Sequence, residues 1–410
     1  MKKFLFVILA IIIASVIISC NTWPRSAAQY TLPIIRINTD NAAPILNRET
    51  WVPMTFSLAD SNSPSNNISA IDNQQIRGRG NSTWSYEEGV KNPYRIRFRE
   101  NQTLFGLPGA RNWVMLKSGE ILNTSVGLEL GQRLGLQYTC SYQHVELYLN
   151  DDYRGIYLFT EHRQADPSVL GAPGRPKVDL NEGWFVEIDR YYDEDPKFRT
   201  ANYDLPIMIK TPEFDPLDIN NPAYNFIVND WNELTGLVAS ADFPENGYRD
   251  LIDIDTFVKY FIVQTVVMNK DLFRTGAEDG TEIGSVFFYK DKDGKISAGP
   301  LWDLDWSLSA DEFEGREFHA NSFPYLIHPF FNRFFQDPVI LTRYNEIWNE
   351  NFINISEIPI FIDDLALKIR RSAIRDIRRW KSGRNFDWEI SELKSYYNAR
   401  ISYLNEIYNE

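Results

Sequence analysis

The sequence feature that most restricts the fold is a predicted β-hairpin at residues 144–163, HVELYLNDDYRGIYLFTEHR. Two runs rich in β-branched and aromatic residues flank an Asn-Asp pair, and a short polar turn between such runs is typical of a hairpin. It is the clearest hairpin signal in the chain. The segment therefore predicts antiparallel β-structure in the N-terminal half.

Alternating apolar and polar residues extend this β-region on both sides of the hairpin. Such alternation, with turn-forming clusters between the runs, is the pattern of half-buried strands. In NPYRIRFRE, for example, Tyr94, Ile96 and Phe98 lie on one face and arginines lie on the other. The runs predicted as strands are residues 32–40, 51–60, 73–84 and 92–100, with further strands around residues 183–211.

Helices are expected within and after this β-region. Apolar spacing predicts a helix over residues 123–136 that begins at an Asn123 or Thr124 cap. The C-terminal half is mainly helical and is interrupted by a hairpin at residues 285–306. The other predicted helices cover residues 222–240, 253–270 and 337–410.

This element order predicts an α+β fold with two lobes, as in protein kinases: a β-rich N-lobe with one helix, and a helix-rich C-lobe. No internal repeat or low-complexity segment divides the chain. The expected organisation is a lipoprotein signal peptide at residues 1–20, a tether at 21–30, a kinase-like domain at 31–320 (N-lobe about 31–212, C-lobe core about 213–320), and a C-terminal helical extension at 321–410.

The first residues predict export. The basic start MKK precedes an apolar run from Phe4 to Ile18, and this run ends in IISC at Cys20. That pattern matches a signal peptide and resembles the lipobox of bacterial lipoproteins, in which the cysteine carries lipid. A plain signal peptide or an uncleaved anchor is the alternative. We expect a protein lipidated at Cys20 and held in the cell envelope, facing outside the cytoplasm.

Charge and motif content exclude several function classes. The formal net charge is -14, whereas nucleic-acid backbones are bound mainly through lysine and arginine, so a nucleic-acid partner is not expected. The four histidines are scattered without the spacing of a zinc site. No serine lies in a Gly-x-Ser-x-Gly motif, which argues against an α/β-hydrolase.

A first candidate site is RGRGNSTW, which starts at Arg77 and ends a predicted strand. Gly78 and Gly80 let backbone N–H groups approach an anion closely, and Arg77 and Arg79 bring positive charge to the same place. The structural alternative is a β-turn with exposed arginines.

A second candidate site involves three aspartates. Asp271 follows the helix predicted at 253–270, and Asp303 and Asp305 follow the hairpin in GPLWDLDW. Phosphotransferases use this order: a loop aspartate orients and deprotonates the acceptor hydroxyl, and an aspartate after a hairpin holds Mg²⁺. On an extended chain Asp303 and Asp305 would share one side. The alternatives are a helix C-terminal residue for Asp271 and a solvated turn for the other two.

The chain resembles the CotH (spore coat protein H) kinase family of atypical secreted protein kinases from about residue 70 to about residue 310. The segments that carry the resemblance are RGRGNSTW, NPYRIRF, NWVML, HVELYLNDDYRGIYLFTEHR, GWFVEID, DLPIMIKTPE and FFYKDKDGKISAGPLWDLDWS. The family implies metal-dependent transfer of the ATP γ-phosphoryl group, with Mg²⁺ or Mn²⁺, to Ser or Thr of surface or secreted proteins.

The resemblance also implies site residues. Asp271 falls at the catalytic-loop aspartate and Asp303 at the metal-binding aspartate, with Asp305 as a second metal ligand or a supporting carboxylate. The residues expected to contact nucleotide phosphates are Arg77, Arg79, Gly80, Lys91, Arg95, Arg97 and Lys210.

Two positions depart from the family pattern. ILNT at residues 121–124 replaces an LLRN-like stretch, and Ser285 stands where an asparagine metal ligand is expected. Asp279 and Glu282 are possible substitutes for that ligand. These departures leave an alternative open: an inactive pseudokinase that serves as a surface scaffold or adhesin and binds protein or glycan.

Overall fold

The structure is a computed structural model that describes residues 31–117, 121–162, 183–214, 218–273, 283–313, 316–321 and 328–409. The predicted signal peptide, the lipidation site Cys20 and the tether at residues 21–30 lie outside these ranges. So do the possible substitute ligands Asp279 and Glu282.

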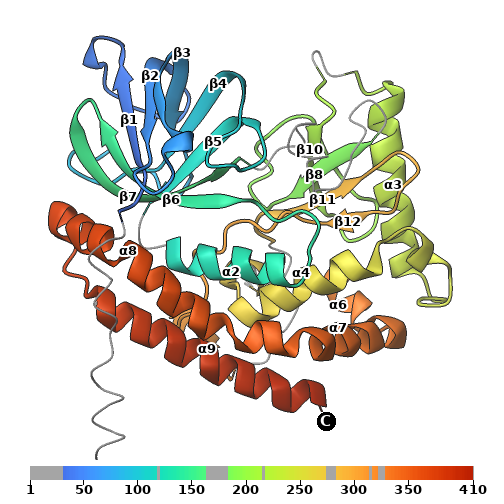
Figure 1. Ribbon diagram of the computed structural model, residues 1–410. Helices are drawn as coiled ribbons and strands as arrows, with labels where there is room; N and C mark the ends of the chain where they lie inside the picture. Colours follow the sequence, from blue (N-terminus) through green and yellow to red (C-terminus); the bar gives the residue numbers. More distant parts are fainter. Residues whose placement is uncertain are drawn as a thin grey trace, which may run out of the picture.

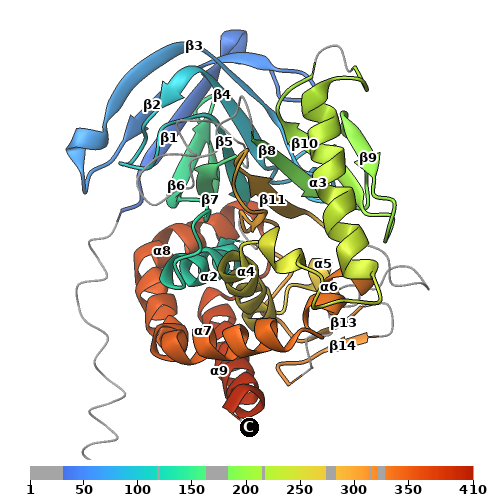
Figure 2. The same cartoon turned by 90° about the vertical axis from the view of Figure 1, so that its right-hand side faces the viewer.

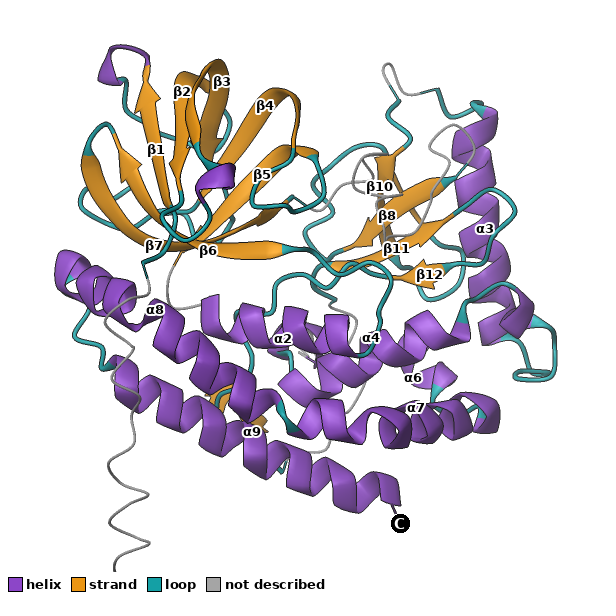
Figure 3. Ribbon diagram, viewed as in Figure 1, coloured by secondary structure: helices purple, strands orange, loops and turns teal. Residues whose placement is uncertain are grey.

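The N-terminal part forms a closed β-barrel with the strand order β1-β2-β3-β4-β5-β7-β6 (Figures 1 and 3). Parallel pairing of β1 with β6 closes the barrel, and the other barrel pairs are antiparallel. Inward side chains such as Ile37, Phe56 and Ile96 are fully buried. The strands are β1 (Ile34–Thr39), β2 (Val52–Ala59), β3 (Ile68–Gly78), β4 (Tyr94–Gln102), β5 (Ala110–Lys117), β6 (Tyr142–Leu149) and β7 (Asp152–Glu161).

The predicted hairpin is confirmed as β6 and β7, which turn at Asn150 and Asp151. Both turn residues have positive φ, 50° and 62°, the conformation that a two-residue hairpin turn requires and that Asn and Asp tolerate. Strand β5 was not predicted. Its central residues Trp113, Val114 and Met115 are all fully buried, so the run lacks the alternation of a half-buried strand.

A second antiparallel sheet has the strand order β12-β11-β8-β10-β9. It joins strands from both predicted lobes, because β8 and β10 precede residue 212 whereas β11 and β12 follow it. Helix α3 lies against this sheet (Figures 1 and 2), where Asp230 accepts hydrogen bonds from Trp184 and Lys290. The elements are β8 (Trp184–Ile188), β9 (Lys197–Arg199), β10 (Pro206–Thr211), β11 (Val286–Lys290), β12 (Ser297–Ala298) and α3 (Pro222–Ala239).

The remaining helices lie beneath the barrel and the second sheet (Figure 1). Helix α4 is central and almost wholly buried, and Arg400 of α9 donates hydrogen bonds to its Thr265 carbonyl. The helices are α2 (Ile121–Arg133), α4 (Ile254–Val267), α5 (Lys270–Phe273), α6 (Pro329–Phe334), α7 (Pro338–Ser356), α8 (Ile358–Trp380) and α9 (Phe386–Asn409). Smaller elements are the 3₁₀ turns at Asp40–Ala42, Pro64–Asn66 and Tyr248–Asp250 and the strands β13 (Asp311–Phe313) and β14 (Arg316–Phe318).

These elements confirm a mixed α+β fold with a sheet-rich N-terminal region and a helical C-terminal region. The closed barrel by itself does not confirm the kinase-like arrangement of lobes. The predicted cap of the first helix was wrong, because α2 begins at Ile121 and both Asn123 and Thr124 lie inside its first turn. Within the described ranges, no helix is both long and apolar enough to span a bilayer.

Helix α8 is bound to the barrel through a buried ion pair. The Lys91 ammonium group lies 2.5 Å from the Asp376 carboxylate, and both side chains are at most 8% exposed. The same two groups bind the Ile156 backbone in β7, where Lys91 donates to the carbonyl and Asp376 accepts from the N–H. Gly155 makes room for this contact, since a Cβ atom there would lie 1.8 Å from an Asp376 oxygen.

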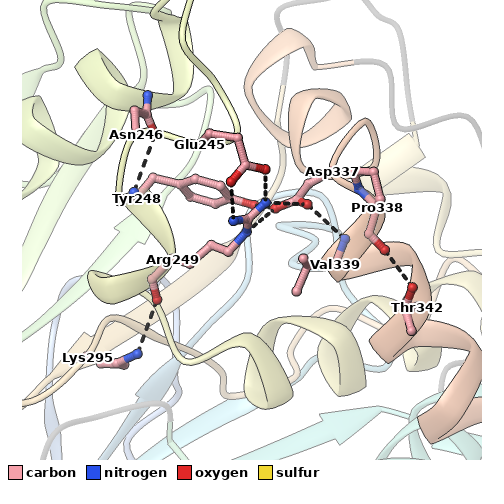
Figure 4. Close-up of polar contacts among 9 residues, drawn as sticks. All are labelled: Glu245, Asn246, Tyr248, Arg249, Lys295, Asp337, Pro338, Val339 and Thr342. Atoms are coloured by element: carbon pink, nitrogen blue, oxygen red, sulfur yellow. Dashed lines mark hydrogen bonds and ion pairs between the residues drawn. The ribbon is translucent and has the colours of Figure 1, made fainter.

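A second polar cluster joins the start of α7 to the turn before α4 (Figure 4). The fully buried Asp337 carboxylate binds Arg249 through two hydrogen bonds of 2.7 and 2.8 Å and accepts another from the Tyr248 hydroxyl. It also caps α7 by accepting from the Val339 N–H. Burial acts to raise the pKa of Asp337, but these hydrogen bonds outweigh burial and the pKa is lowered.

We predict that Lys91→Met lowers the free energy of unfolding by about 3 kcal/mol or more, because it leaves Asp376 as a buried charge without its partner. In a double-mutant cycle with Asp376→Leu, measured by urea denaturation, the double mutant should lose about 2 kcal/mol less than the sum of the two single losses. A Lys91→Met protein as stable as the wild type would show that the ion pair does not hold the barrel on α8.

We predict that Asp337→Ala lowers the free energy of unfolding by about 3 kcal/mol, through loss of the helix cap and of the Arg249 partner. Asp337→Asn is the matched control, because asparagine can still cap the helix, and it should lose less. A carboxylate whose pKa is lowered on folding contributes stability above its unfolded pKa. As the pH falls below about 4, the wild type should lose this contribution. Asp337→Asn has no carboxylate at this position and should show no such loss. Identical acid unfolding curves for the two proteins would contradict this role.

Candidate functional site

A cavity of about 970 Å³ lies where the barrel, α2, the second sheet and the loop after β12 meet. This volume falls within the range of small-molecule sites. The lining comes from segments far apart in the sequence, including the end of β3, the end of β5, and residues 301–306. The cavity is therefore the candidate functional site.

The barrel side of the cavity is basic. Arg77, Arg79 and Arg95, which were predicted to contact phosphates, line it together with Arg48 and Lys117. Lys117 donates a hydrogen bond of 2.9 Å to the Thr83 carbonyl, which holds the end of β5 against the loop after β3. The Arg79 guanidinium lies 5.7 Å from the centre of the Trp302 ring, so it reaches across to the opposite wall.

Two glycines allow the loop after β3 to turn tightly. Gly80 has a φ of +85°, a backbone conformation that favours glycine. A Cβ atom on Gly78 would lie 2.4 Å from the Trp84 ring. Both residues line the cavity. The glycines let Trp84 and Thr83 pack closely on this loop, and the Gly78 N–H donates to the Asn47 carbonyl at 3.0 Å. Anion binding by the loop stays a prediction.

The opposite side carries the three predicted aspartates, which all line the cavity. Asp271 lies on α5, and its N–H donates to the Asn269 side chain. The same Asn269 side chain donates to the Asp303 carbonyl at 3.3 Å. Backbone segments that are 34 residues apart are thus joined through one amide.

Helix α2 fixes the loop that carries Asp303 and Asp305. The Asn123 amide donates to the carbonyls of Asp305 and Ser307 at 3.0 and 2.7 Å. Gly127 allows close packing, because a Cβ atom there would lie 2.4 Å from Leu304. Asn123 therefore acts as an anchor for the loop rather than as the helix cap predicted from the sequence.

The prediction that Asp303 and Asp305 share one side of an extended chain was wrong. Residues 301–310 form no strand, and Asp303 has a φ of 47°, which breaks the alternation of an extended chain. The alternative of a fully solvated turn does not apply either, since Leu301 and Leu304 are completely buried and both aspartates are half-buried. The two carboxylates reach the cavity through the shape of the loop.

Opposite charges face each other across the cavity. The pKa of Asp305 is raised first by burial and then by the Asp271 carboxylate, whereas Arg79 and Lys117 act to lower it. Two carboxylates and two cations are therefore close enough to affect one another. Burial and the Asp271 carboxylate both disfavour the charged form of Asp305, and a bound cation would favour that form.

Asp189 is a cavity residue that the sequence prediction missed. Its buried carboxylate accepts hydrogen bonds from the Ser285 N–H at 2.7 Å, the Ser285 hydroxyl at 3.1 Å and the Tyr191 N–H at 2.8 Å. Mainly because of burial, its pKa is raised. The next residue, Arg190, lies 3.8 Å from Asp271. In the sequence, Asp189 and Arg190 directly follow the strand GWFVEI, and this charged pair was the signal that could have indicated a site residue.

Three predicted phosphate contacts lie outside the cavity lining in the described structure: Lys91, Arg97 and Lys210. Lys91 is held by Asp376, as described above. Arg97 packs on the Trp51 ring with its guanidinium 4.2 Å from the ring centre. Lys210 binds Glu187 and Glu194 at 2.6 and 2.5 Å, so its charge is already paired. We therefore leave these three residues out of the candidate site.

Comparison with protein families agrees with the resemblance inferred from the sequence motifs. The sequence model described as "CotH kinase protein" matches residues 76–404. The chain belongs to the CotH kinase family. The match takes in the cavity lining except Arg48 and Glu49, together with α6 to α8 and most of α9, so the C-terminal helices are part of the region shared with the CotH kinase family. No curated protein matches the chain.

Proposed function

We propose that this protein is an ATP-dependent phosphotransferase that transfers the γ-phosphoryl group to serine or threonine of surface or secreted proteins. The observation that carries the proposal is the cavity in which Asp271, Asp303 and Asp305 face Arg79 and Lys117. Membership of the CotH kinase family supports a kinase-like activity. In this proposal the barrel and the helical region serve as the two lobes of a kinase-like enzyme.

The barrel side of the cavity is the proposed phosphate site. Arg79 and Lys117 would bind the triphosphate oxygens, and arginine can do so through two parallel hydrogen bonds. Arg77 and Arg95 add positive charge to the same wall. The Gly80 backbone, which lines the cavity, would add an N–H donor, whereas the Gly78 N–H already donates to the Asn47 carbonyl. Positive charge fixed before the substrate arrives stabilises the charge that develops on the transferring group.

The aspartate side fits a divalent cation of the Mg²⁺ or Mn²⁺ type. Within the described ranges, no group of three His, Cys, Asp or Glu side chains forms a metal cage. Magnesium needs only one or two carboxylates, with phosphate and water oxygens as its other ligands. Asp303 and Asp305 would hold the ion, and their position in one cavity with Asp271 supports this assignment. When bound, the ion would neutralise charge on the phosphate oxygens.

Asp271 is the proposed acceptor of the hydroxyl proton. Its position beside Asn269 and Arg190 restrains the carboxylate at the edge of the cavity. There it would orient the Ser or Thr hydroxyl towards the phosphoryl group and accept its proton.

A second candidate function is an inactive scaffold or adhesin that binds protein or glycan. Ser285 favours it, because its hydroxyl donates to Asp189 at the position where the family pattern leads us to expect an asparagine metal ligand. This alternative keeps the cavity and predicts nucleotide or ligand binding without transfer.

We expect Asp271→Asn to lower phosphoryl transfer by about a hundredfold or more, and Asp303→Asn to raise the Mg²⁺ or Mn²⁺ concentration that transfer requires. The assay uses the full chain in detergent, labelled ATP, Mg²⁺ or Mn²⁺, and a casein-like acceptor. Asp293→Asn, at an exposed position in the turn between β11 and β12, is the matched control and should behave as the wild type.

Equal labelling by the wild type and both site variants, or none by any of them, would exclude the kinase. If ATP and metal together raise the melting temperature but no label is transferred, the scaffold alternative is supported.

We also propose that the protein is anchored in the cell envelope by lipid on Cys20 and faces outside the cytoplasm. The proposal rests on the sequence alone, namely the basic start, the apolar run Phe4–Ile18 and the IISC ending. An acceptor on surface or secreted proteins is consistent with this location.

We expect wild-type protein to incorporate labelled fatty acid and to stay with membranes in high salt, whereas Cys20→Ser should incorporate none. A plain signal peptide would leave both proteins soluble. An uncleaved anchor would keep both in the membrane, without label and with residues 1–20 attached.

A further inference from the structure

A group of arginines surrounds one tryptophan on the outer surface of the barrel. The guanidinium carbons of Arg97, Arg77 and Arg95 lie 4.2, 4.9 and 5.8 Å from the centre of the Trp51 ring. Arg111 lies close enough to Arg97 for its positive charge to lower the pKa of Arg97. We refer to Trp51 and these four arginines as the arginine face.

Strand register explains why these side chains gather. Arg77 of β3 pairs directly with Arg95 of β4, so the two side chains leave the sheet on the same face. Ile76 and Ile96 point the other way and are fully buried inside the barrel. Strands β4 and β5 form the side of the barrel nearest the second sheet (Figure 1). The arginine face therefore lies on the same side of the barrel as the cavity.

The carboxylates that act on Arg77 and Arg97 do so from beyond ion-pair distance: Glu49 and Glu194 act on Arg77, and Glu213 acts on Arg97. The chain has a formal net charge of -14, yet no carboxylate among the described residues lies within ion-pair distance of Arg77, Arg97 or Arg111. Burial, followed by a neighbouring arginine, lowers the pKa of both Arg77 and Arg97. The buried Nε donor of Arg77 has no hydrogen-bond acceptor among the described residues. An anionic ligand would relieve both the repulsion and the unmet donor.

We propose that the arginine face docks an acidic segment of the acceptor protein and so brings an adjacent Ser or Thr into the cavity beside Asp271. The inference rests on the proposed phosphotransferase function and deepens it, because it names the substrate class. The face is continuous with the cavity, since Arg77 and Arg95 also line the cavity whereas Arg97 lies outside the lining.

The spacing on the arginine face fits an extended polypeptide. Arg95 and Arg97 are alternate residues of one strand, so their Cα atoms lie about 6.8 Å apart. Alternate residues of an extended peptide have nearly the same spacing. Arg77 and Arg95 already donate to the Arg48 carbonyl and the Asn112 side chain. Stacking on Trp51 holds the Arg97 guanidinium, which makes no hydrogen bond to the described residues and could bind a carboxylate through paired hydrogen bonds.

The first test measures binding and does not need activity. The probe is a fluorescein-labelled peptide in which Glu alternates with Ala and the acceptor Ser is replaced by Ala; a second peptide has Gln in place of Glu. We expect the full chain in detergent to bind the Glu peptide about tenfold more tightly than the Gln peptide, and to lose this preference at high salt.

The variants are Arg97→Glu and the matched control Arg36→Glu. Arg36 also stacks on an aromatic ring, with its guanidinium 4.3 Å from the centre of the Tyr148 ring, but it lies on β1. Arg97→Glu should weaken binding of the Glu peptide about tenfold or more, and Arg36→Glu should leave it unchanged. Equal binding of the two peptides, or equal losses in the two variants, would overturn the proposal.

The second test measures transfer to peptides that retain the acceptor Ser. Arg97→Glu should raise KM for the Glu peptide about tenfold and leave kcat and the KM for ATP unchanged. A raised KM for ATP would place Arg97 in the nucleotide site and overturn the docking role. Binding of the Glu peptide without any transfer would contradict the proposed function alone, and transfer without preference for Glu would contradict the docking alone.

Discussion

The buried contact between Lys91 and Asp376 determines how the barrel sits on the helices. The two buried charges compensate each other, and together they satisfy the Ile156 backbone in β7. The site depends on this contact indirectly, because its basic wall belongs to the barrel and its acidic wall to the loops around α4. A barrel that shifted on α8 would change the separation of the two walls.

The second sheet provides the other fixed reference for the site. Asp189 follows β8 and holds Ser285, which precedes β11, while Arg190 lies beside Asp271. Pairing of β8 with β11 therefore brings the segment directly after β8, which carries Asp189 and Arg190, close to Asp271. The sheet contains strands from both sides of the domain boundary that we predicted, so the cavity is bounded by a structure that belongs to neither predicted lobe alone.

Local sequence signals identified most elements and the main charged groups. The Asn150-Asp151 turn, the helix that became α4 and the convergence of Asp271 with Asp303 and Asp305 followed from turn chemistry, periodicity and motif order. Closure of the barrel was not predictable, because pairing of β1 with β6 joins distant segments without a local signal. Lys91 looked like a phosphate ligand because it lies next to a cationic strand, and only the fold reveals the partner 285 residues away. Lys117 and Asp189 were missed because each comes at the end of an apolar strand, and only the fold brings them to the cavity.

The packing of Leu304 against Gly127 has a consequence for how motifs of this kind should be compared between proteins. The loop with Asp303 and Asp305 takes its shape from the surface of α2, where a glycine makes room and Asn123 binds two carbonyls. A WDLDW segment grafted onto a scaffold without that helix surface would keep its sequence but lose the arrangement of its carboxylates. In divergent sequences, the residues at positions 123 and 127 of α2 are thus as informative about a working site as the aspartates themselves.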